Sequence, residues 1–215
     1  MVEALTQAGR VELPLRPAVL GSRVPNAFTL PGGKIYLFDG LLQKPQSPDE
    51  VAGVLAHEIG HVLHRDQTRM MIQNGGTSFL IGLLFGDITG SSAVIFATRT
   101  LFESAYSRRA EANADAFAIE TMHALGRSPA PLGEFLHRIA GAQDRYTIGI
   151  LASHPLTEER RALMRREARA ATGPEILSPG EWQALKDVCS AADPNLARAL
   201  SGGETGGSLE PLEPR

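Results

Sequence analysis

The sequence contains a single cysteine, few aromatic residues and no excess of basic residues. Because Cys189 is alone among the 215 residues, the chain can form neither an intrachain disulfide nor a cysteine-ligated zinc site. The formal net charge of -3 argues against a nucleic-acid-binding protein, which needs a concentrated basic patch. Hydrophobic residues make up 43% of the chain, enough for the core of a globular domain, so a wholly disordered chain is excluded.

A long uninterrupted hydrophobic run is also missing. The most hydrophobic stretch, residues 79–102, is broken by Gly86, Asp87 and Gly90, whereas a membrane-spanning helix needs about 20 mostly apolar residues. We therefore expect two short buried helices around a turn in this stretch. The first residues of the chain lack the charged start and apolar core of a signal peptide. The chain is expected to be soluble, with peripheral contact to a membrane left open.

The residue pattern predicts an α+β fold that is mainly helical. Short runs rich in Val, Ile, Phe and Tyr flank a Pro-Gly-Gly turn at residues 31–33, which predicts a small antiparallel β-sheet at about residues 17–40. The sequence Ser-Pro-Asp-Glu at residues 47–50 has a capping serine, a proline at the first helical position and a glutamate three residues on. Apolar residues at helical spacing follow, so we expect a buried helix over about residues 48–65.

Four more helices are expected, each bounded by a capping residue, a glycine or a proline: residues 103–125, 131–142, 157–171 and 178–188. The last of these opens with a second capping box, from Ser178 to Glu181. Residues 201–215 have no hydrophobic pattern and are expected to be a disordered tail. Residues 1–200 are expected to form a single domain.

The strongest chemical motif is HExxH at residues 57–61, inside the first predicted long helix. His57 and His61 are four residues apart and share one helix face, so both imidazoles can point at a single ion. Zinc accepts neutral histidine nitrogen and favours four ligands. Glu58 lies beside that face, which is typical of a metalloprotease in which the glutamate is the general base. The alternative is a pair of histidines that merely pack in a helix.

A zinc site that keeps one position open for water needs a third protein ligand. Glu111 and Asp115 lie one turn apart in an alanine-rich segment that is suited to burial, where two acids are costly unless they meet a cation or hydrogen-bond donors. Glu111 as a ligand and Asp115 as the acceptor for a ligand histidine would remove that cost. The alternative is two solvated acids beside Arg108 and Arg109.

The remaining histidines carry less information. His154 precedes a proline in a predicted loop; near the metal it could donate a hydrogen bond to the oxyanion of a tetrahedral intermediate. His64, His123 and His137 have no partner pattern and are expected to be structural or surface residues. Asp66 is expected to close or follow the zinc-binding helix.

Four separated motifs in this order resemble one group of gluzincin metalloproteases. They are Asn-Ala-Phe-Thr-Leu-Pro-Gly-Gly at residues 26–33, HExxH, Ser-Arg at residues 107–108 before the acids at 111 and 115, and His-Pro at residues 154–155 with Arg160. The group includes the HtpX-type heat-shock proteases, the CAAX prenyl proteases and soluble quality-control relatives. The break in residues 79–102 is unlike the membrane spans of the HtpX-type proteins, so the soluble quality-control branch is the nearest likeness.

The resemblance implies a role for each residue of the motifs. His57, His61 and Glu111 correspond to the ligands of one Zn²⁺ per chain, and Glu58 corresponds to the general base. Asp115 and Arg160 would hold the ligand side chains in place without binding the zinc ion themselves. His154 would stabilise the transition state or hold the site closed. The resemblance also favours a membrane-associated or cell-envelope location.

These residues lead us to expect a zinc metalloendopeptidase that acts on unfolded or damaged proteins. An extended substrate would pair with the edge of the predicted sheet at residues 27–30 (Ala27, Phe28, Thr29 and Leu30), because backbone pairing tolerates many sequences. Glycines at positions 82, 86 and 90 are expected to form a mobile flap. The alternative is a catalytically latent, zinc-binding chaperone-like or assembly factor on the same scaffold; the presence of Glu58 favours the enzyme.

Overall fold

The computed structural model describes residues 1–70, 72, 106–141 and 148–189. The predicted helix pair at residues 79–102, its three glycines and the tail at residues 201–215 lie outside these ranges. The described helices and strands, in chain order, are α1 (Val2–Ala8), β1 (Arg16–Leu20), β2 (Ala27–Leu30), β3 (Lys34–Phe38), α2 (Asp39–Leu42), α3 (Pro48–Leu63), α4 (Asp66–Met70), α7 (Arg108–Ala124), α8 (Ala130–Gly141), α9 (Ile148–Ser153), α10 (Glu158–Arg166) and α11 (Pro179–Lys186). The fold is α+β and mainly helical, as predicted.

The described sheet has three strands in the order β1-β3-β2. The Pro-Gly-Gly turn joins β2 to β3 as an antiparallel pair, but β1 runs parallel to β3. The prediction of a wholly antiparallel sheet is therefore wrong for one of its two strand pairs. A tight turn dictates the antiparallel direction of the strands it connects, whereas the position of β1 depends on tertiary packing. Strand β2 is left at one edge of this sheet.

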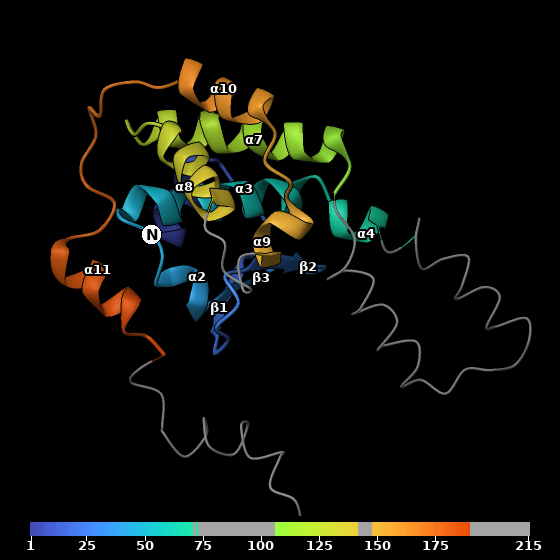
Figure 1. Ribbon diagram of the computed structural model, residues 1–215, viewed down its shortest axis with the longest axis horizontal. Coiled ribbons are helices and arrows are strands. Elements are labelled where there is room, and N and C mark those ends of the chain that lie inside the picture. The colour runs from blue at the N-terminus through green and yellow to red at the C-terminus, as the bar shows by residue number, and fades with distance from the viewer. Residues whose placement is uncertain (71, 73–105, 142–147, 190–215) are drawn as a thin grey trace, which may run out of the picture.

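Helix α3 lies between α7 and the sheet and is buried from Glu50 to Val62 (Figure 1). Ser47 is its N-cap and Pro48 its first residue, as predicted, but the serine side chain makes no capping hydrogen bond. Glu50 instead accepts a hydrogen bond from the backbone N–H of Gln46 (2.8 Å) and pairs with Arg138 of α8 (2.6 Å). A buried carboxylate gains more from this guanidinium than from the cap, so α3 is tied to α8 at its start.

Helices α3 and α7 pack closely at Gly60, inside the HExxH motif. A Cβ atom placed on Gly60 would lie 2.9 Å from the Cα atom of Ala114, which belongs to the backbone of α7. Ala114 directly precedes Asp115, one of the two predicted acidic site residues of α7. Glycine at this position therefore lets the two helices that carry the candidate site pack against each other.

Replacing Gly60 with alanine is expected to push these helices apart. Overpacking of a well-packed contact costs about 1–3 kcal/mol, so urea unfolding should show a loss of that size, together with weaker zinc binding. Gly141→Ala is the matched control, because an added Cβ atom at Gly141 meets nothing within 4 Å. Equal stabilities of the two variants would show that α3 and α7 adjust freely.

The other helices differ from their predicted bounds at the ends. Helix α7 begins after Ser107, whose Oγ accepts from the backbone N–H of Ala110. Helix α10 ends at Arg166, earlier than predicted, and α11 has the predicted capping box of Ser178 with Glu181. Helices α1, α2, α4 and α9 were not predicted, because each is short and none begins with a capping box. Leu5 of α1 is nevertheless fully buried in the core.

Candidate metal centre

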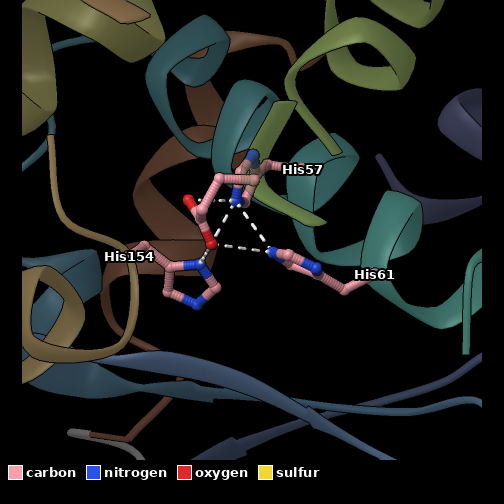
Figure 2. Close-up of side chains that lie close together, drawn as sticks. His57, His61 and His154 are labelled. Carbon is pink, nitrogen blue, oxygen red and sulfur yellow. Dashed lines mark hydrogen bonds and ion pairs between the residues drawn. The ribbon is translucent and has the colours of Figure 1, made fainter. Parts of the chain in front are cut away.

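Four side chains from three separate parts of the chain meet in the buried interior. His57 and His61 come from α3 and Glu111 from α7, and His154 directly follows α9. Figure 2 shows the labelled imidazoles of His57, His61 and His154 turned toward one another. One donor atom from each lies within 4.8 Å of the donor atoms of the others. The structure thus brings together the three predicted metal ligands and adds His154 to them.

Four of the six spacings between the donor atoms are close to those of a tetrahedral zinc site, and the other two are within 4.8 Å. With Zn–N bonds of about 2.0–2.1 Å, the ligand atoms of a tetrahedron lie about 3.3 Å apart. His57 Nε2 lies 3.1 Å from His61 Nε2 and 3.2 Å from His154 Nδ1. Glu111 Oε1 lies 3.0 Å from His154 Nδ1 and 3.3 Å from His61 Nε2. Three imidazole nitrogens and one carboxylate oxygen are also the ligand types that zinc prefers.

Each of the two histidines of α3 has an acidic side chain next to its Nδ1 atom. Asp66 Oδ2 is hydrogen-bonded to His61 Nδ1 (2.9 Å), and Asp115 Oδ1 lies 3.0 Å from His57 Nδ1. Such partners orient a ligand histidine, because they leave Nε2 to face the metal. Asp66 follows the helix as predicted, but its contact with His61 was not foreseen, since an acid five residues after a histidine is no recognised pattern.

A buried ion-pair network holds the two acids of α7. Arg160 of α10 donates to both carboxylate oxygens of Asp115 (2.7 and 2.8 Å), and its other terminal nitrogen lies 2.6 Å from Glu111 Oε2. All three side chains are buried or nearly so, which excludes the alternative of two solvated acids beside Arg108 and Arg109. The structure places Arg160 beside the predicted third ligand.

The charges of this cluster shift its pKa values in opposite directions. Burial favours the neutral form of His57, but the carboxylates of Asp115 and Glu111 outweigh it and raise the pKa of His57 to about 9. Burial would raise the pKa of Glu111, yet the neighbouring histidines, His154 first, hold that pKa far below its usual range. Burial lowers the pKa of His154. Glu111 is therefore ionised and suited to bind a cation, and His154 is favoured as the neutral imidazole that a metal requires.

Glu58 and Tyr106 complete the interior of the site. Glu58 is fully buried, and both of its carboxylate oxygens lack a hydrogen-bond partner among the described residues; Oε1 lies 3.2 Å from His154 Nε2. Tyr106 stacks on the ring of His61 with centroids 4.0 Å apart, and its backbone N–H donates to Ser153. Tyr106 was missed, because a lone tyrosine before a helix start has no chemical signature.

The predicted substrate-binding residues and the three remaining histidines lie outside the cluster. Residues 27–30 form the edge strand β2, with Ala27 and Thr29 buried. His64 hydrogen-bonds to a backbone carbonyl of its own helix, and His123 hydrogen-bonds to the carbonyl of Glu167. His137 is exposed. These three histidines lie outside the cluster, in the structural or surface positions expected of them.

Comparison with known proteins agrees with this geometry. The sequence model of peptidase family M48 matches residues 2–168 of this chain, and these residues include the whole cluster. The chain belongs to peptidase family M48. Membership confirms the resemblance to the quality-control branch of the HtpX-like proteases and places the chain among the zinc metalloendopeptidases. The family implies a metal, typically zinc, and the buried histidine and glutamate donors fit that ion.

Among the relatives is the beta-barrel assembly-enhancing protease of Escherichia coli K12, 26% identical over 76% of this chain and 36% of its own length. The corresponding Vibrio cholerae protein is 32% identical over 77% of this chain and 37% of its own length. The mitochondrial metalloendopeptidase OMA1 of Saccharomyces cerevisiae is 31% identical over 63% of this chain and 41% of its own length. The chain thus spans less than half the length of these relatives. Within the described ranges, every helix is too short or too polar to cross a membrane.

Proposed function

We propose that this M48 chain hydrolyses peptide bonds in unfolded or damaged polypeptides, with Glu58 as the general base. The observation that carries the proposal is the buried Glu58 carboxylate, whose oxygens have no hydrogen-bond partner among the described residues although it lies beside the metal-ligand cluster. A buried acid without a hydrogen bond is costly, and the His154 imidazole 3.2 Å away offsets that cost only when it is protonated, so the presence of Glu58 there points to a chemical role. A protein that only binds zinc has no need of it.

The roles of the individual residues follow from their positions. His57, His61 and Glu111 would hold the zinc ion, and the chemistry that such an ion supplies is Lewis-acid polarisation of the attacking water and the scissile carbonyl. Glu58 takes a proton from the attacking water and later gives it to the nitrogen of the leaving amine. Asp66 and Asp115 keep the ligand histidines in the tautomer that presents Nε2.

The substrate is proposed to bind as an added strand on the open edge of β2. In an antiparallel ladder, alternate residues turn their backbone N–H and C=O groups toward the partner strand and away from it. Phe38 donates its backbone N–H to Asn26, so the next residues that face β3 are Phe28 and Leu30. The backbone polar groups of Thr29 therefore face the edge that has no neighbouring strand in the described sheet. Thr29 is only 2% exposed, so an extended peptide of any sequence can pair with them once the groups that cover this edge have moved.

The test is cleavage of an unfolded protein such as casein by the zinc-loaded wild type and the Glu58→Gln variant side by side. Cleavage by the wild type alone would support the proposal and the role of Glu58 together. Equal cleavage by both proteins would contradict the role of Glu58 and point to a contaminating protease.

One observation favours a second possibility, a latched form of the same enzyme. His154 Nδ1 lies 3.2 Å from His57 Nε2 and 3.0 Å from Glu111 Oε1, so it would take the fourth ligand position, which a catalytic zinc site keeps open for water. In this conformation His154 would have to leave before a substrate carbonyl could enter. The same side chain, once displaced, is near enough to stabilise an oxyanion.

We expect the His154→Ala variant to cleave casein faster than the wild type at saturating zinc, because the fourth position is then open. It should also lose zinc more readily to a chelator, since three protein donors remain instead of four. Both effects are measured by initial rates and by chelator competition. A slower variant with unchanged zinc affinity would contradict the latch and assign His154 to transition-state stabilisation; the exposed His137→Ala variant is the matched control.

A further inference from the structure

A pocket of about 390 Å³ lies where the end of β2 meets the junction of α3 and α4. Its walls include the apolar side chains of Leu13, Leu30 and Val62, and the side chains of Arg65 and Gln67 add polar groups. The volume falls within the range of about 300–1,000 Å³ that is usual for sites that bind small groups. Leu13 is 41% exposed and Arg65 is exposed, so the pocket is bordered by surface residues. The pocket is large enough for a side chain of a bound peptide.

Gln67 lies in the wall of this pocket and carries an unused hydrogen-bond donor. The residue is 2% exposed, and its Nε2 atom is buried with no hydrogen-bond partner among the described residues. A buried donor without an acceptor loses its hydration and gains nothing in return. A ligand that carries an acceptor oxygen would satisfy it after the Gln67 amide turns toward the pocket.

Arg65 is held at the pocket in a backbone conformation that arginine rarely adopts. Its φ angle is 53°, directly after the C-cap residue His64 of α3. Glycine or asparagine usually occupies this left-handed position after a helix, because a Cβ atom there is unfavourable. Strain of this kind at a pocket wall is a recognised sign of a functional constraint. The residue that bears it here is a cation.

The pocket adjoins the proposed substrate path along the chain. Leu30 follows Thr29, whose backbone polar groups point away from β3, and Val62 follows the ligand His61. Gln67 follows Asp66, which is hydrogen-bonded to His61. A peptide that pairs with Thr29 therefore continues past Leu30 into the pocket.

We propose that this pocket is a substrate subsite that takes a carboxylate of the bound polypeptide. Arg65 and the Nε2 donor of Gln67 would bind the carboxylate oxygens, and the apolar walls would contact the methylene groups that carry them. The carboxylate could belong to an acidic side chain or to a free C-terminus. The inference rests on the proposed endopeptidase function, since it places the pocket on the substrate path.

The test measures peptide binding to the full zinc-loaded chain that carries Glu58→Gln, so that bound peptides stay intact. Fluorescently labelled peptides with amidated C-termini are compared in pairs that differ by Glu against Gln at one position, moved along the peptide. A third peptide has no acidic side chain and a free C-terminus. Since a hydrogen bond to a charged group is worth more than one to a neutral group, we expect about tenfold tighter binding of one Glu peptide than of its Gln partner.

Substitutions at the pocket should change this ratio. Arg65→Gln should abolish most of the preference and Arg65→Glu should reverse it, while Gln67→Met, which removes an unpartnered buried donor without leaving a void, should reduce it. Arg10→Glu is the matched control, because Arg10 is also an exposed arginine with a positive φ angle (51°) and does not line the pocket.

The outcomes test the proposed subsite separately from the proposed endopeptidase function. A ratio that is unchanged in Arg65→Glu, or equally changed in Arg10→Glu, would overturn the subsite. A preference that follows the free C-terminus would support the subsite and identify the terminal carboxylate as its ligand. If the wild type cleaves neither these peptides nor casein although the binding preference holds, the proposed endopeptidase function fails and the carboxylate pocket stands.

Discussion

The Glu58→Gln variant is expected to bind zinc as tightly as the wild type and to cleave casein about 10²- to 10⁴-fold more slowly, the range that general-base catalysis contributes. The glutamine has the same shape as glutamate but cannot take a proton from water. Because the Glu58 carboxylate is fully buried without hydrogen-bond partners among the described residues, losing its charge should leave the fold intact or stabilise it. Initial rates, zinc content and thermal unfolding would be measured on the same preparations.

Glu120→Gln is the matched control for this experiment. Glu120 is an exposed residue of α7, so the substitution makes the same chemical change far from any ligand contact. Its rate and zinc content should equal those of the wild type. A Glu58→Gln variant that fails to bind zinc would show that Glu58 acts on the metal site itself, and one that keeps its full rate would remove Glu58 from the mechanism.

The Arg160→Ala variant is expected to show the largest loss of stability. Without Arg160, the buried carboxylates of Asp115 and Glu111 lose their shared cation, and breaking a buried ion pair from one side costs about 3–5 kcal/mol. Burial raises the pKa of Asp115 and the Arg160 guanidinium lowers it, so the ionised Asp115 would be destabilised most by the loss of Arg160. Urea unfolding followed by circular dichroism would measure the loss, with chelator and with zinc.

Zinc affinity should fall as well, by about 10- to 100-fold. Arg160 orients the ligand Glu111, and it also orients Asp115, which contacts the ligand His57. Arg165→Ala is the control, since Arg165 lies on the same helix but pairs with the half-exposed Glu134; its loss should stay within about 1 kcal/mol. If Arg160→Ala does not fold, Arg160→Lys should fold with an intermediate stability, because it keeps the charge but not the two-pronged hydrogen bond. Equal stabilities of the Arg160 and Arg165 variants would contradict the network.

Local sequence was sufficient where the chemistry depends on neighbours along the chain. The proline at the start of α3 and its apolar spacing located a buried helix, and the spacing of His57 and His61 placed both on one face. The capping box of Ser178 with Glu181 was predictable for the same reason, since the two residues meet within one helical turn. Here the backbone geometry alone fixes which side chains meet.

Tertiary packing decided the rest. His154 lies 97 positions from His57 in the sequence, and only the family resemblance placed it near the metal. The parallel direction of β1, the stacking of Tyr106 on His61 and the hydrogen bond of Asp66 to His61 were not predicted at all.

By itself, the sequence determined an α3 helix that presents two histidines and a glutamate, and an α7 helix whose two acids, if buried, need a cation or hydrogen-bond donors. The tertiary structure decided which cations and donors these are, because α10 brings Arg160 to Asp115 and α9 brings His154 to Glu111. The physical reason is that periodicity and capping act over a few residues of one element. Burial of charge is settled between elements, where each carboxylate is stable only beside the partner that the whole fold supplies.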